Sequence, residues 1–116
     1  MTLYGVSQSS GVERRLKVEM GAHGIVLILI DHVGGKERER ILVPANDLLD
    51  AVTAPPIGGS VIEGISPPHG PKMLLGVEVR RNEVLLKASR ASGEGSDVAV
   101  GLDDFQDAME GVIKRE

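Results

Sequence analysis

Short apolar runs recur along the chain, separated by polar or glycine-rich segments. Within Val12–Met20, charged and apolar residues alternate from Arg15 onward, which is the two-residue period of a half-buried strand. Ile25–Ile30 is continuously apolar and rich in β-branched residues, as is typical of a strand buried on both faces. In Arg38–Val43 charged and apolar residues alternate again. Together with Thr2–Ser7, these runs predict four strands in the first half.

A strand that runs into a helix is predicted twice, in Ile41–Thr53 and in Val98–Glu110. In each segment a β-rich run stops at a helix breaker, Pro44 or Gly101, and an acidic first helical turn follows. The first helix is expected to end before Pro55. The second helix carries an apolar stripe at helical spacing, formed by Phe105, Ala108, Met109, Val112 and Ile113.

The two halves of the chain resemble each other, which indicates an internal repeat. Gly5–Gly11 aligns with Gly64–Gly70 at an offset of 59, and the two strand–helix segments align at an offset of 57. The second copy is therefore two residues shorter, and we expect the deletion in the turn between its third and fourth strands. The copies would span 1–56 and 57–116. Chance similarity between Gly- and Val-rich sequences is the alternative.

These elements predict an α+β fold in which two tandem β-β-β-β-α repeats pack into one pseudo-symmetric domain, 1–116. Each half alone would bury too little apolar surface to be stable. Each helix is expected to cover a sheet face or the other helix. The second repeat would supply strands at Ser60–Ser66, Met73–Arg80, Glu83–Ser89 and Asp97–Val100.

Composition adds few constraints on function. There is no cysteine, so neither a disulfide nor a thiolate metal site is expected. The first ten residues lack a signal-peptide pattern, and the longest apolar run is too short to span a bilayer. We therefore expect a cytoplasmic protein without a membrane partner. The net charge is −4, but the predicted strands are mildly basic and the helix regions acidic.

The first repeat resembles a repeat of the Pur-alpha family, and the element order is similar to the related Whirly and transcriptional positive cofactor 4 folds. The residues that carry the resemblance are a basic strand (Arg14, Arg15, Lys17), a turn with Gly24, an aliphatic strand (Val26–Ile30), a Gly34-Gly35-Lys36 turn and Arg38. The resemblance implies that the two repeats intertwine, that the helices cross between the sheets, and that the outer sheet faces bind single-stranded DNA or RNA.

Two functions follow from the predicted outer face. A non-catalytic single-stranded nucleic-acid-binding protein would contact phosphates through cations on the strands and turns: Arg14, Arg15, Lys17, Lys36, Arg38, Arg40 and Lys87. The alternative is a structural or protein-interaction module that forms a homodimer through the apolar strip of Val26, Ile28 and Ile30. An acidic chain with one Tyr, one Phe and no Trp favours this alternative.

Catalysis has little support in the sequence, and neither an enzyme nor a cofactor is predicted. His23, His32 and His69 fall in or beside predicted turns without ligand-like spacing, so no metal site is expected. Asp103 and Asp104 fall in the first turn of a helix, where carboxylates serve capping and the helix dipole. The glycine pairs lack the spacing of phosphate-binding loops.

Overall fold

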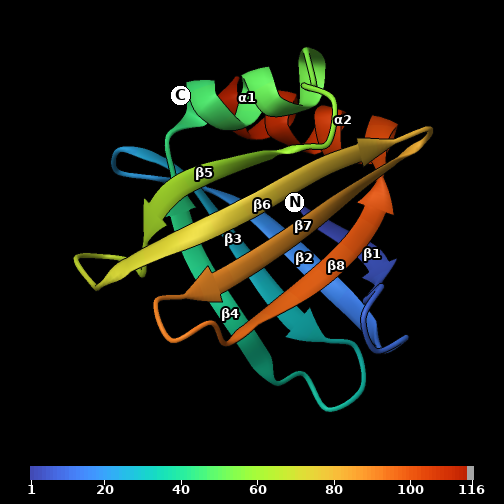
Figure 1. Ribbon diagram of the computed structural model, residues 1–116, viewed down its shortest axis with the longest axis vertical. Coiled ribbons are helices and arrows are strands. Elements are labelled where there is room, and N and C mark those ends of the chain that lie inside the picture. The colour runs from blue at the N-terminus through green and yellow to red at the C-terminus, as the bar shows by residue number, and fades with distance from the viewer. Residues whose placement is uncertain (115–116) are drawn as a thin grey trace.

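A computed structural model of the chain describes residues 1–114 and contains eight strands and two helices in that range. The strands and helices follow the order β-β-β-β-α twice (Figure 1). Their bounds are β1 Thr2–Val6, β2 Glu13–Gly21, β3 Gly24–Asp31, β4 Glu37–Val43, α1 Ala45–Thr53, β5 Ser60–Ile65, β6 Lys72–Arg80, β7 Glu83–Arg90, β8 Gly95–Gly101 and α2 Leu102–Ile113.

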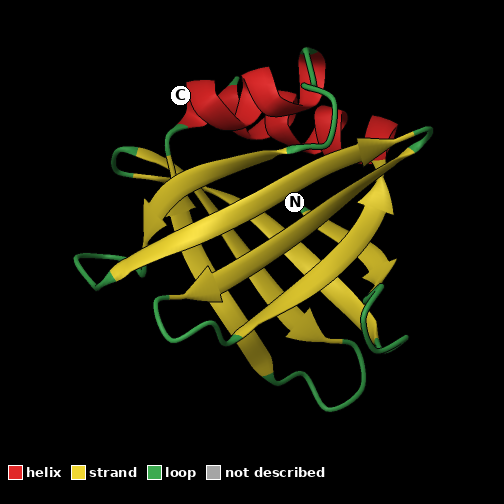
Figure 2. Cartoon of the chain, in the orientation of Figure 1, coloured by secondary structure: helices red, strands yellow, loops and turns green. Residues whose placement is uncertain are grey.

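The prediction of an α+β, Pur/Whirly-like packing is wrong, because the eight strands form one closed antiparallel barrel in sequence order. The helices do not cross between two sheets. They lie side by side over one end of the barrel (Figure 2), and the turns β3–β4 and β7–β8 lie at the opposite end. A hydrogen bond of 3.2 Å from Gln106 Nε2 to the Val52 carbonyl joins the two helices.

The two halves pair along both edges because glycine is present at both closing seams. Each seam has a single residue pair in the ladder, Leu42 with Ile65 and Val6 with Ala99. A Cβ on Gly64 would lie 2.4 Å from the Leu42 carbonyl oxygen, and a Cβ on Gly5 would lie 2.1 Å from that of Ala99. Only a residue without a side chain allows these backbones to approach so closely.

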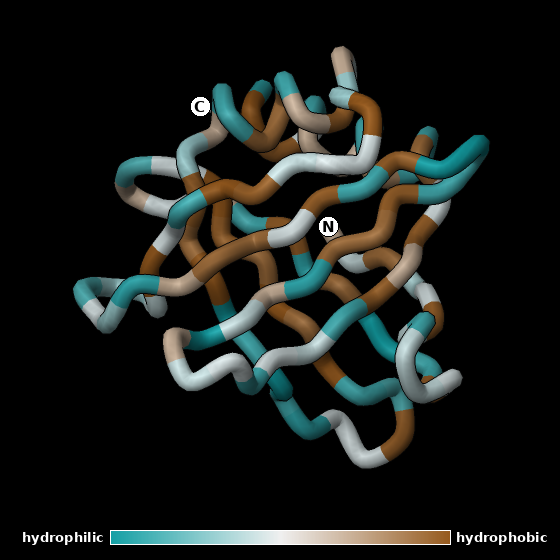
Figure 3. Tube along the Cα trace, in the orientation of Figure 1, coloured by the Kyte–Doolittle hydropathy of each residue, from teal (hydrophilic) through white to brown (hydrophobic). Residues whose placement is uncertain are grey.

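The barrel interior is the hydrophobic core, and side chains fill it. Apolar residues dominate the middle of the strands, whereas polar residues gather at the turns opposite the helices (Figure 3). Leu48, Val52, Phe105 and Met109 are buried and close the helical end. The strands contribute the buried residues Leu16, Val18, Ile25, Leu27, Leu29, Ile41, Val43, Ile62, Met73, Leu75, Val77, Val84, Leu86, Ala88, Val98 and Val100.

Strand pairing repeats between the halves at the offsets found in the sequence. The pair Leu16–Leu29 corresponds to Leu75–Ala88, both residues being shifted by 59. On the fourth strands the offset is 57, and the loss of two residues relative to the earlier offset of 59 occurs in two places. A register irregularity near Arg38 in β4 is absent from the regular ladder of β8. The β7–β8 turn, closed by Arg90 and Glu94, is also one residue shorter than the β3–β4 turn, closed by Asp31 and Lys36.

The two helices are short and begin without side-chain capping bonds. Pro44 and Gly101 are the N-cap residues, both with extended backbone. Pro44 thus directly precedes the first helical residue, Ala45. Neither helix in residues 1–114 has the length and hydropathy that crossing a bilayer requires.

Replacing a seam glycine is expected to oppose barrel closure. Gly64→Ala should lower the free energy of unfolding by about 1–3 kcal/mol, because the added methyl group must displace backbone atoms. Chemical denaturation monitored by circular dichroism measures the change. Gly76→Ala is the matched control, because a Cβ at this mid-strand glycine would have no neighbour closer than 3.9 Å. Equal stabilities of the two variants would contradict the role assigned to the seam.

Candidate functional site

Most of the predicted nucleic-acid-binding residues lie on one outer face of the barrel, formed by β1 to β4. Cross-strand pairing aligns Lys17, Ile28 and Arg40 in one row, and Tyr4, Arg15 and Ile30 in the next. Lys36 is exposed in the turn before β4. We call the cations and rings of this surface the basic face: Tyr4, Arg15, Lys17, His32, Lys36, Arg38 and Arg40. Arg15 is half-buried and the others are exposed.

The basic face includes an aromatic pair that the sequence analysis missed. The Tyr4 side chain is 68% exposed, and its ring meets that of His32 edge-on, with 5.7 Å between centroids. A hollow of about 290 Å³ lies beside the two rings. His32 belongs to the turn after β3, so its closeness to β1 depends on pairing between three strands. The spacing of Tyr4 and His32 along the sequence therefore does not predict that their rings meet.

The cations of the basic face differ in how far they are already neutralised. Arg38 is paired with Asp31, and Arg40 is paired with Glu37 at 2.7 Å. Within residues 1–114, Arg15, Lys17 and Lys36 make no ion pair. Lys17 and Lys36 are therefore exposed and free to pair with an external anion. Arg15 is half-buried, and its Nε is buried without a hydrogen-bond partner among residues 1–114.

Arg14, the first of the predicted binding residues, is instead buried at the polar end of the barrel. It is 9% exposed and donates through Nε to Asp31 at 3.2 Å and through Nη1 to the Asp97 carbonyl at 2.7 Å. Arg38 donates to the second oxygen of Asp31 at 2.6 Å. Arg14 thus links β2, β3 and β8, and it does not belong to the basic face.

Asp31 and Asp97 are carboxylates that their hydrogen-bond partners keep charged. Burial alone would raise the pKa of Asp31, but the hydrogen bonds and charges of Arg38 and Arg14 outweigh burial, and the net shift is downward. The pKa of Asp97 is also lowered, because hydrogen bonds outweigh its burial. The donors to Asp97 are Ser7 Oγ, Ser9 Oγ and the amides of Gln8 and Ser9, at 2.6–3.2 Å.

The pKa of Glu39 shifts in the opposite direction to those of Asp31 and Asp97. Its side chain faces the interior of the barrel, is 7% exposed, and pairs at 3.1 Å with Arg90, which is half exposed. Burial raises the pKa of Glu39, and the attraction of Arg90 offsets this only in part. Arg90 also pairs with Glu94 at 3.3 Å. Glu39 therefore belongs to the packing of the barrel end and not to an exposed site.

The predicted interface strip is largely covered within one chain. Ile28 is 2% exposed because it lies between the side chains of Lys17 and Arg40. Val26 and Ile30 are half-buried. The apolar area that this strip offers to a partner is smaller than the sequence suggested.

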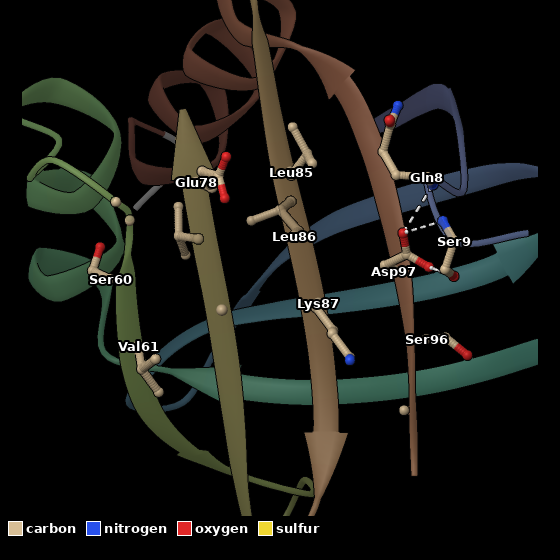
Figure 4. A pocket seen from close by; sticks show the side chains of 15 residues that line it. Gln8, Ser9, Ser60, Val61, Glu78, Leu85, Leu86, Lys87, Ser96 and Asp97 are labelled. Atoms are coloured by element: carbon tan, nitrogen blue, oxygen red, sulfur yellow. Dashed lines mark hydrogen bonds between the residues drawn. The ribbon is translucent and has the colours of Figure 1, made fainter. Parts of the chain in front are cut away.

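A second candidate site lies on the outer face of β5 to β8, where Lys87 is found. It is a groove of about 650 Å³ (Figure 4). Val61 flanks the groove, Leu85 and Lys87 lie along β7, and Asp97 is held by Gln8 and Ser9. The floor contains Gly76, which leaves the middle of the face without a side chain. Lys87 thus lies apart from the other predicted cations.

The structure brings no metal or catalytic cluster together among residues 1–114. No group of three or more His, Asp or Glu side chains there could hold a metal ion. His23 and His69 lie in separate turns, and Asp103 and Asp104 lie in the first turn of α2. Comparison of the chain with protein-family models, curated proteins and solved structures gives no match. Function must therefore be inferred from the two outer faces.

The two buried carboxylates should respond oppositely to neutral substitution. A lowered pKa means that Asp31 contributes stability above its unfolded pKa, and that this contribution is lost as pH falls through the folded pKa. Asp31→Asn should therefore cost about 2 kcal/mol at pH 7 and much less near pH 3. Denaturation at the two pH values measures this difference.

Glu39→Gln is the matched comparison. Because the pKa of Glu39 is raised, the folded state is penalised by its charge above that pKa and relieved as pH falls. The neutral variant should be at least as stable as the wild type at pH 7, with Arg90 still paired to Glu94. A loss at pH 7 as large as that of Asp31→Asn would contradict the account of the polar end.

Proposed function

We propose that the protein is a non-catalytic binding protein for single-stranded nucleic acid and that it binds through the basic face. The observation that carries this proposal is the juxtaposition of Tyr4 and His32 with three unpaired cations on one barrel surface. Base–aromatic stacking contributes about 1–3 kcal/mol per base, and each phosphate contact releases counterions. Exposed rings beside unpaired cations supply both contributions.

The arrangement favours single strands over duplexes. Tyr4 and Arg15 are cross-strand partners, and the Tyr4 ring already meets His32. An unstacked base can lie on these rings while its flanking phosphates reach Lys17 and Lys36. Bases in a duplex are stacked on one another and do not offer their faces.

The other sequence predictions have less support or no test. Self-association through Val26, Ile28 and Ile30 is less favoured because Ile28 is already buried by its own chain. The cytoplasmic location, the absence of a cofactor and the lack of enzyme activity stay predictions. Among the predicted binding residues, Arg14 is assigned to the barrel and Lys87 to the other face.

Tyr4 is expected to report binding directly, because it is the only tyrosine in a chain without tryptophan. Titration with oligothymidylate or oligouridylate should quench its fluorescence as bases stack on the ring. Tyr4→Leu should weaken binding by about tenfold or more, measured by anisotropy of a labelled oligonucleotide. Tyr4→Phe should retain most of the affinity because it keeps the ring.

The salt dependence tests the phosphate contacts separately. Three unpaired cations predict a slope of about −2 for the logarithm of affinity against the logarithm of salt concentration. Lys17→Gln should reduce the magnitude of this slope by about 0.7. Lys87 also makes no ion pair within residues 1–114 but lies on the other face, so Lys87→Gln should leave the slope unchanged. Equal effects of the two variants, or no binding at low salt, would contradict the proposed surface.

A further inference from the structure

Gly76 lies in the middle of β6 at a position where the barrel does not require a glycine. Its backbone is not in the left-handed region. A Cβ there would lie 3.9 Å from its nearest neighbours, the Cβ and carbonyl oxygen of Lys87. The ladder passes through Gly76 to Val61 and Lys87 without a shift, so there is no bulge. Glycine weakens a strand interior and marks a bulge, a tight bend, or a site where a ligand or another backbone approaches closely. With no bulge present and open space above Gly76, close approach of a ligand is the role that fits this position.

In the first half the position that corresponds to Gly76 carries a side chain. Gly76 corresponds to Lys17 at the offset of 59, and Lys87 corresponds to Ile28. In the first half the lysine side chain lies beside the isoleucine, and Ile28 is 2% exposed. In the second half the side chain at the first of these positions is missing, and a groove of about 650 Å³ lies over the strands.

The walls of the groove combine apolar surface with one free positive charge. Val61 is 68% exposed and Leu85 is half-buried. Asp97 is the cross-strand partner of Lys87, but its carboxylate is paired with Arg14 at 3.7 Å and accepts hydrogen bonds from the β1–β2 turn. Glu78 is paired with Arg80. Within residues 1–114, Lys87 makes no ion pair. The charge left for a ligand is therefore positive.

We propose that this groove binds a small amphiphilic anion, with an apolar body over Gly76 and a carboxylate or sulfonate group paired with Lys87 Nζ. The apolar body would lie between Val61 and Leu85. The volume falls within the range of small-molecule sites, which combine apolar walls with few polar groups. This function is separate from nucleic-acid binding, because the groove lies over β5 to β8 and the basic face lies on β1 to β4.

Naphthalene-2-carboxylate is a suitable probe, with 2-naphthylmethylamine as the cation of the same apolar body. Isothermal titration should give saturable 1:1 binding of the carboxylate and at least tenfold weaker binding of the amine. Gly76→Leu, which fills the groove, and Lys87→Gln, which removes the charge, should each weaken carboxylate binding at least tenfold. Lys17→Gln is the matched control and should leave it unchanged.

Several results would overturn the proposal. These are equal affinity for the carboxylate and the amine, undiminished binding to Gly76→Leu, or no saturable binding to the wild type at millimolar concentration. Circular dichroism of Gly76→Leu verifies that the variant is folded, and Lys87→Gln tests the same site without filling it. A sedimentation change from dimer to monomer in Gly76→Leu would mean that a second copy occupies the groove, which also contradicts the proposal.

Discussion

Close backbone approach at the two seams is the constraint on which the rest of the structure depends. Each seam has one ladder pair, so ladder hydrogen bonds at the seams contribute little to closure. Closure rests on the shared apolar interior and on Gly5 and Gly64, whose missing side chains let the edges meet. Once the barrel is closed, its interior is filled, the helices cover one end, and the outer faces become the surfaces available for binding.

At the polar end of the barrel, ion pairs join the two similar halves. Arg14 and Asp31 are paired in the first half, whereas the corresponding positions hold Met73 and Arg90. Among residues 1–114, two ion pairs cross between the halves, from Arg14 to Asp97 and from Arg90 to Glu39. These contacts join opposite sides of the barrel where the apolar core ends. The Arg14 pair is buried, and breaking a buried pair costs far more than its net contribution, so this pair favours one arrangement of the halves. The Arg90 pair adds less, because Arg90 is half exposed.

The sequence predicted local structure well because its signals are local. The period of two correctly separated inward residues, such as Leu16 and Ile41, from outward residues, such as Lys17 and Arg40. The same period occurs in an open sheet and in a closed barrel, so it could not distinguish the two. The deciding residues, Gly5 and Gly64, appeared in the sequence only as aligned repeat positions inside predicted strands, because their contacts are made across seams distant in sequence. The burial of Arg14 and the contact of Tyr4 with His32 depend on strand pairing for the same reason.

The central claim is that the halves present outer faces of different chemistry and that nucleic acid binds only the first. Backbone amide shifts of ¹⁵N-labelled protein, recorded during titration with a single-stranded oligonucleotide, test this claim most directly. The account predicts changes concentrated at Tyr4, Arg15, Lys17 and Lys36, with Gly76 and Lys87 unaffected. Changes centred on β5 to β8, or no changes at low salt, would contradict it.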